Sequence, residues 1–360
     1  MENRTEVRLS IIIPVYNGKQ YLKKLFDSMQ KLESCEPEIL LVDDCSEDES
    51  GTYCRELAKI NPNVRVLEKE RREGIAASRN LGLKHARGRY VCFIDQDDKI
   101  EPGVYLKALH SAEEHQIECC LWATRLVFED GRQEKDFSFP AEKTYEETEI
   151  RQALLEQYLR KDDSERIFKI PGHVWAGMFL KDFLEKNGIS FFSFVDYEDD
   201  CVFMNQVMRH CKKLTVFPDA GYYWTRNLKS ESHRVKYIED FWEKSTRLKD
   251  WYQSAIYDIF SGETPPLEKL QKEEAVKIYE YVENLCSIKN PAPRTSVIKE
   301  LSQFFSVSHH YDAISEEKPP YGGAGKRRQI LRKLILARRY GTIHIFLRMY
   351  RRINILKTGS

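Results

Sequence analysis

Three carboxylates lie close together at Asp95, Asp97 and Asp98, directly after the apolar run that ends at Ile94. Like charges this close repel, so they stay ionised only if a cation or strong hydrogen-bond donors lie among them. A solvated loop is the plainest alternative. However, Asp95 and Asp97 are two positions apart, and in extended backbone such side chains point the same way. The spacing therefore predicts a site for Mn²⁺ or Mg²⁺, completed by water and substrate phosphates.

Two further acidic groups could join this site. Asp43-Asp44 follows the apolar run "EILLV", and Asp199-Asp200 lies within "YEDDCVF" at the start of an expected helix. Acidic residues in the first turn of a helix also stabilise the helix dipole, which is the structural alternative for the second group.

The elements that carry these groups alternate between strand and helix over the first hundred residues. Apolar, β-branched runs predict buried strands at 8–15, 38–42, 64–68 and 89–94, and helical patterns follow each of them. Ser46 and Glu49 have the spacing of a capping box for the second helix. Repeated strand–helix units predict a doubly wound, mostly parallel α/β sheet, in which ligands bind at the carboxyl ends of the strands. The acidic groups at Asp43-Asp44 and at Asp95, Asp97 and Asp98 fall at that edge, and the group at Asp199-Asp200 does not.

Length and composition predict more than one unit. We expect an α/β domain over 1–235, with a first half at 1–117 and a second half at 118–235. A helical extension over 236–306, a linker over 307–325 and a basic amphipathic tail over 326–360 should follow. The nine cysteines are scattered and no apolar run is long enough to cross a membrane. Reduced thiols and a cytoplasmic location are expected.

The tail carries an unusual charge distribution. Residues 318–360 contain twelve lysines and arginines and no acidic residue, although the whole chain has no net charge. One interpretation is peripheral contact with an anionic membrane surface, and another is a helix that packs on the acidic body or on a partner. Nucleic acid is disfavoured because no nucleic-acid-binding module is present.

The first strand is followed by neither G-x-G-x-x-G nor a P-loop, so a metal rather than a glycine-rich loop would have to neutralise a diphosphate. The segments "SIIIPVYNGKQYL", "EILLVDDCSEDES" and "GIAASRNLGLKHARGRYVCFIDQDD" resemble, in order and spacing, the family 2 glycosyltransferases of the GT-A fold. "VWAGMFLKDFLEKNGISF", "YEDDCVF" and "GYYWTRNLKSES" extend the resemblance more loosely to about residue 230. The resemblance implies a nucleotide-sugar donor. It also implies that residues 1–235 form a GT-A domain, with 1–117 as the nucleotide-sugar-binding half and 118–235 as the acceptor half.

The resemblance also implies roles for individual residues. It places the nucleotide against Pro14, Tyr16, Asn17, Asp43, Asp44, Gly74, Arg79 and Asp95. Within that set, Asp43 would accept from the imide of the base, Asp44 would shape the turn, and Arg79 would lie beneath the nucleotide. Asp95 and Asp97 match the D-x-D motif, with Asp97 as the preferred metal ligand and Asp95 facing ribose or metal.

The sequence departs from the family pattern in two places. Ser78 stands where the family has alanine, and Glu73 stands where asparagine usually precedes the glycine. Ala176-Gly177 replaces the asparagine and lysine that often follow the tryptophan at 175.

Sugar transfer with inversion requires one base to take the proton of the acceptor hydroxyl. The family pattern has an aromatic residue three positions after the second acid of a pair, so Phe203 selects Asp200, and a shift of one residue would select Asp199. We therefore expect an inverting, metal-dependent enzyme that uses a nucleotide sugar, most simply a UDP-sugar, to extend a surface or capsular polysaccharide or a lipid-linked glycan. An inactive nucleotide-sugar-binding scaffold is the alternative. A sugar-phosphate nucleotidyltransferase would need a glycine-rich basic loop after the first strand, which "PVYNGKQ" does not provide.

Overall fold

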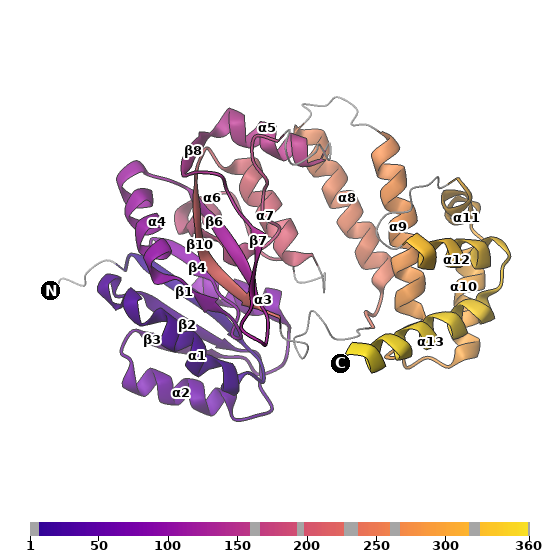
Figure 1. The fold of residues 1–360 in the computed structure, drawn as a ribbon, viewed down its shortest axis with the longest axis horizontal. Helices are drawn as coiled ribbons and strands as arrows, with labels where there is room; N and C mark the ends of the chain where they lie inside the picture. The colour runs from indigo at the N-terminus through magenta and orange to yellow at the C-terminus, as the bar shows by residue number, and fades with distance from the viewer. Residues whose placement is uncertain are drawn as a thin grey trace. The chain divides into compact units, whose positions relative to one another are not determined.

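The computed structural model describes residues 7–158, 166–192, 198–226, 237–259, 267–316 and 325–358. The chain divides into two compact units, Met1–Asn227 and Leu228–Ser360, and each is described by itself (Figure 1).

The first unit is a mixed α/β domain. Its strands are β1 (Leu9–Val15), β2 (Glu38–Asp43), β3 (Val64–Glu68), β4 (Tyr90–Phe93), β5 (Lys99–Ile100), β6 (Cys119–Val127), β7 (Gln133–Phe137), β8 (Lys143–Glu146), β9 (Gly177–Leu180) and β10 (Lys213–Thr225). Its α-helices are α1 (Lys19–Met29), α2 (Ser50–Ile60), α3 (Ile75–His85), α4 (Pro102–His115), α5 (Glu147–Tyr158), α6 (Lys181–Lys186) and α7 (Asp199–His210), with short 3₁₀ turns at Gln30–Cys35 and Val174–Ala176.

One sheet runs through this unit in the order β3-β2-β1-β4-β9-β6-β10-β5, with β7 on β6 and β8 on β10. The strands β3, β2, β1 and β4 are all parallel, as are β6 and β10. The remaining pairs are antiparallel. The predicted doubly wound α/β sheet is therefore confirmed, and the carboxyl ends of β1, β2 and β4 lie at one edge.

The central strand β1 is buried along its whole length. Its successive side chains point to opposite faces of the sheet, and helices cover both faces. Leu9, Ile11 and Ile13 belong to the core that α1, α2 and α4 share with one face of the sheet. Ile12 points to the opposite face, which α3 covers (Figure 1).

A glycine sets how closely α3 approaches the sheet. A Cβ atom on Gly82 would lie 2.3 Å from Cγ2 of Ile12, a distance that real side chains do not adopt. Gly82 therefore permits the helix to pack directly on β1, although a glycine inside a helix costs about 1 kcal/mol relative to alanine. The same helix carries Arg79, so this contact positions a candidate site residue.

The second unit is helical in its described part. It contains α8 (Phe241–Ile259), α9 (Leu267–Leu285), α10 (Arg294–Phe304), α11 (Ser308–Ser315), α12 (Gly325–Leu336) and α13 (Tyr340–Thr358). The predicted helical C-terminal region is confirmed. The segment 307–325, expected as a linker, contains α11, and its residues 317–324 lie outside the described residues.

The basic tail packs on its own unit with one face. Arg327 and Arg351 both form ion pairs with Glu283 of α9, at 3.0 and 3.7 Å. Leu331 and Leu347 are buried. Packing on the body, one of the two interpretations of the tail, thus holds within the second unit. Among the described residues, no helix is both long and apolar enough to cross a membrane.

Candidate functional site

The loop after β1 is tied to the D-x-D turn by its backbone. The amide N–H of Tyr16 donates to Oε1 of Gln96 at 3.1 Å, and Nε2 of Gln96 donates to the carbonyl oxygen of Tyr16 at 3.0 Å. Gln96 lies between Asp95 and Asp97, so this pair of hydrogen bonds fixes the turn against the first loop. Sequence reasoning assigned no role to Gln96, and its position inside the D-x-D motif is the signal that could have found it.

The loop after β2 joins the same edge from the other side. Asn17 has a left-handed backbone, with φ of 48°, and its N–H donates to Oγ of Ser46 at 3.1 Å. Ser46 in turn donates from both its N–H and its hydroxyl to Oδ1 of Asp43. The capping box predicted from Ser46 and Glu49 is wrong, because α2 begins only at Ser50 and Ser46 bonds within the loop instead. Asp43 is buried at the edge where the nucleotide base was expected.

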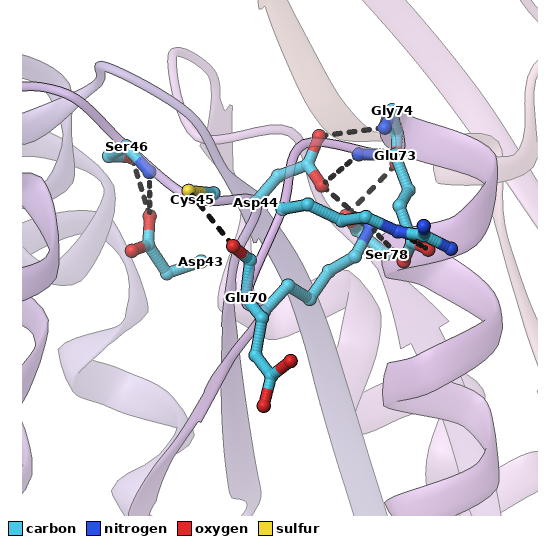
Figure 2. A network of polar contacts seen from close by, with 10 residues as sticks. Asp43, Asp44, Cys45, Ser46, Glu70, Glu73, Gly74 and Ser78 are labelled. Atoms are coloured by element: carbon cyan, nitrogen blue, oxygen red, sulfur yellow. Dashed lines mark hydrogen bonds and ion pairs between the residues drawn. The ribbon is translucent and has the colours of Figure 1, made fainter.

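Asp44 shapes the turn that carries Gly74, as Figure 2 shows. Its carboxylate accepts from the N–H groups of Gly74 and Glu73 at 2.8 and 2.9 Å, and from Nζ of Lys69 at 2.6 Å. The side chains of Asp44 and Lys69 are only 6% and 5% exposed. Gly74 has φ of 88°, which favours glycine there, and α3 begins at the next residue. The ion pair therefore anchors the N-terminus of α3.

The three acids after β4 have different surroundings. Asp98 is buried and accepts from the hydroxyl of Tyr222 and from the N–H of Thr225, both at 2.7 Å. The same Tyr222 oxygen accepts from the N–H of Asp95 at 3.0 Å. Burial, and then the charge of Asp97, raises the pKa of Asp98 well above its usual range. Asp98 therefore fixes the turn to β10, while Asp95 and Asp97 are partly exposed.

Arg79 joins two of the acidic groups across the site. This side chain is 2% exposed, and its Nη2 donates to Oδ1 of Asp95 at 2.9 Å. Its Nη1 pairs with Oδ2 of Asp199 at 3.2 Å and with Oδ1 of Asp200. The strand pattern placed Asp95 at this edge, but it did not predict that Arg79 holds Asp199 and Asp200 against it.

Asp200 is partly buried and both of its carboxylate oxygens are engaged. Its second oxygen accepts from the N–H of Val174 at 3.4 Å. Burial raises the pKa of Asp200 to about 7, against the opposing charge of Arg79. A carboxyl group with a pKa near neutrality is suited to general-base chemistry.

Three aromatic rings stack beside these acids. His173 lies flat on Trp175 with ring centroids 4.5 Å apart, and Trp175 lies on Tyr222 at 4.4 Å. Trp175 and Tyr222 are buried, whereas His173 is exposed at the outer end of the stack. Burial of part of the imidazole lowers the pKa of His173, so its ring is neutral near pH 7. The stack holds Tyr222, and through it the D-x-D turn.

Asp97 and Asp95 could hold a hard divalent cation that takes few protein ligands. Asp95, Asp199 and Asp200 share the single positive charge of Arg79, which leaves negative charge uncompensated at this edge. Within the described ranges, no group of three or more His, Cys, Asp or Glu side chains is arranged as a metal site. An ion here would therefore rest on Asp97 and Asp95 and take its other ligands from water and substrate.

Comparison with known proteins finds similarity to glycosyltransferases. The sequence model described as Glycosyl transferase family 2 matches residues 10–181. The minor teichoic acid biosynthesis protein GgaB of Bacillus subtilis is 36% identical over 125 residues, which are 34% of this chain and 14% of GgaB. The poly(ribitol-phosphate) beta-N-acetylglucosaminyltransferase TarS of Staphylococcus aureus is 28% identical over 243 residues, 66% of this chain and 39% of TarS. The chain thus spans well under half the length of these two relatives.

A solved structure has the same fold. The crystal structure of S. aureus TarS 1–349 in complex with UDP-GlcNAc superposes with a TM-score of 0.56 and 22% identity, over 96% of this chain and 92% of that structure.

Proposed function

We propose a function from the premise that this chain belongs to glycosyl transferase family 2, whose sequence model covers residues 10–181 of its first unit. The chain transfers a sugar from a nucleotide-sugar donor to a hydroxyl group of a glycan acceptor. The observation that carries this proposal is the ion network of Arg79, which joins the D-x-D residue Asp95 to the acidic pair Asp199-Asp200. Donor and acceptor chemistry can therefore meet at one edge of the sheet.

The transfer inverts the anomeric centre, with Asp200 as the base. Its carboxylate takes the proton of the acceptor hydroxyl while the oxygen attacks the anomeric carbon, and the diphosphate leaves with the electrons of the broken bond. Asp200 is favoured because its pKa is raised to about 7, and because Arg79 and the N–H of Val174 orient both of its oxygens. Asp199 shares Arg79 and is the alternative base.

The donor is a UDP-sugar. Crystal structures of S. aureus TarS carry UDP or UDP-GlcNAc, which supports a uridine nucleotide for a chain of the same fold. The base and ribose would lie along Asn17, Asp43 and Asp95, where the loops after β1, β2 and β4 meet. Mn²⁺ or Mg²⁺ held by Asp97 and Asp95 would neutralise the leaving diphosphate. The buried Nε of Arg79 has no partner within the described residues and could donate to a donor oxygen.

The acceptor is a polymer of the cell surface that contains polyol phosphate, or a lipid-linked form of it. The support comes from relatives named for teichoic acid biosynthesis and for poly(ribitol-phosphate) glycosylation.

The second unit provides a face for peripheral attachment to an anionic membrane. Ile345, Met349 and Ile353 recur every fourth residue along α13, and they are 44%, 58% and 48% exposed. A stripe with this spacing forms one face of a helix. It lies in a segment with twelve basic and no acidic residues between 318 and 360. Exposed apolar side chains among cations are typical of helices that lie on anionic lipid.

The test is a donor screen followed by a transfer assay. The full chain is heated with a panel of nucleotide sugars and Mn²⁺, and the true donor should raise the melting temperature because it binds only the folded state. UDP release with a polyol phosphate polymer as acceptor then separates an enzyme from an inactive scaffold, which would bind the donor without turnover. No shift with any UDP-sugar would contradict the proposal.

A further inference from the structure

A cavity of about 370 Å³ lies beside the D-x-D turn in the first unit. Its lining residues come from several parts of this unit. Lys24 comes from α1, Asp97 and Lys99 from the turn after β4 and from β5, Phe128 from the loop between β6 and β7, and Arg226 from the residue after β10. Asp97 is thus shared between this cavity and the D-x-D motif, so the cavity lies next to the place where the donor diphosphate is proposed to bind.

The cationic side chains of the cavity have no carboxylate partner among the residues that the structure describes. No ion pair in the described part of the chain includes Lys24, Lys99 or Arg226, whereas the neighbouring Lys23 pairs with Asp27 at 2.9 Å. Other surface cations of this unit are commonly paired in the same way. Three unpaired cations around one cavity form an environment that favours an anion.

The carboxyl group of Asp98 also lines the cavity, but its two oxygens are already engaged. Oδ2 accepts from the hydroxyl of Tyr222 and Oδ1 accepts from the N–H of Thr225. Within the described residues, Asp98 forms no ion pair with Lys24, Lys99 or Arg226. Glu129 lines the rim and is exposed to solvent.

Two of the cations are held on regular backbone. The N–H of Arg226 donates to the carbonyl oxygen of Val127 at 2.8 Å, and the guanidinium group lies 5.8 Å from the ring centre of Phe128. Lys99 lies on β5, directly opposite Tyr223 of β10. Because these strands already fix the backbone, a ligand would have to order only the ends of the side chains.

We propose that this cavity binds a phosphate group of the acceptor. The inference rests on the proposed function and adds a location and a chemical class to it. A metal at Asp97 would neutralise the donor diphosphate, so Lys24, Lys99 and Arg226 remain for a second anion. A phosphate accepts charge-assisted hydrogen bonds from both arginine and lysine. In a phosphodiester-linked acceptor, this phosphate would thus belong to the repeat next to the one that carries the reacting hydroxyl.

The experiment titrates glycerol 3-phosphate into the full chain by calorimetry at constant ionic strength, with and without saturating UDP and Mg²⁺. The wild type should bind the probe in both conditions, because the acceptor site is separate from the donor site. The double variant Lys99→Gln/Arg226→Gln should bind it at least about tenfold more weakly, since each charge-assisted bond lost accounts for roughly a factor of ten. The control variant Lys23→Gln removes a charge next to Lys24 on α1 but outside the cavity. It should bind the probe like the wild type.

Three outcomes would overturn the proposal: no binding of glycerol 3-phosphate to the wild type, unchanged binding to the double variant, or displacement of the probe by UDP. Displacement would show that the cations serve the donor diphosphate instead. If UDP itself does not bind, the proposed function fails while the phosphate site is still judged by the titration without UDP. In the transfer assay, the double variant should raise KM for the acceptor and leave KM for the donor unchanged.

Discussion

Replacement of Asp44 by Asn should destabilise the first unit far more than the same change at an exposed ion pair. The Asp44 carboxylate is 6% exposed and receives three donors, from Lys69, Glu73 and Gly74. An asparagine keeps one acceptor oxygen but turns an NH₂ group toward these donors. Lys69, only 5% exposed, would lose the charge that compensates its ammonium group.

The magnitude follows from burial. Removing one partner of a buried ion pair costs about 3–5 kcal/mol, because the remaining charge is left without compensation. Glu73 lies 3.2 Å from Nζ of Lys69 and would retain part of that compensation, so the lower value, about 3 kcal/mol, applies. For a unit of this size, such a loss lowers the melting temperature by about 6–12 °C.

The assay is thermal unfolding of the full chain, followed through the transition of the first unit. The control is Asp27→Asn, which breaks the pair with Lys23 on α1, where the two side chains are 54% and 74% exposed. That change should cost less than about 1 kcal/mol. Asp44→Asn/Lys69→Met should recover part of the loss, because no unpaired ammonium remains. Equal melting temperatures for the two single variants would refute the reasoning.

Five further predictions concern the site and the tail. Asp97→Asn should remove the Mn²⁺-dependent part of UDP binding in calorimetry, and unchanged binding would show that Asp97 is no ligand. Asp200→Asn should lower kcat by about 100-fold or more, as loss of a general base does, and a larger loss with Asp199→Asn would move the base by one residue. Because the pKa of Asp200 is raised to about 7 and only its ionised form accepts a proton, wild-type kcat should rise with pH through that value, so a flat profile across it would count against Asp200. Arg79→Lys keeps the charge but loses the guanidinium fork that contacts Asp95 on one side and Asp199 and Asp200 on the other, so kcat should fall, and wild-type kcat would argue against an orienting role. Met349→Glu should weaken sedimentation with anionic vesicles without changing transfer to a soluble acceptor, and equal sedimentation would exclude this face.

The edge of the sheet could be predicted from the sequence because the relevant signals are local. Long β-branched runs end at Asp43 and just before Asp95, and parallel strands bring such ends to one side. The resemblance to a known family then assigned roles to these residues. The resemblance also singled out Gly74, and the structure shows why glycine suits this position, since its φ is 88°.

The contacts of individual side chains could not be predicted, because their partners lie far away in the chain. Arg79 meets Asp200, 121 positions later, and the hydroxyl of Tyr222 reaches Asp98 across 124 positions. The spacing of apolar residues along the chain predicts helices and strands but not which distant side chains will meet. The capping box at Ser46 failed for a related reason: a serine hydroxyl bonds equally well to a nearby carboxylate, and Asp43 competes with the helix N-terminus for it.

The close contact between Gly82 and Ile12 limits which residue types can stand at position 82. Arg79 lies three residues before Gly82 on the same helix, so any side chain at position 82 would lever the helix outward and withdraw the guanidinium group from its carboxylates. Alanine would improve the helix and still harm the catalyst. The distance between Arg79 and its carboxylate partners thus depends on the lack of a side chain at Gly82, where α3 packs against Ile12.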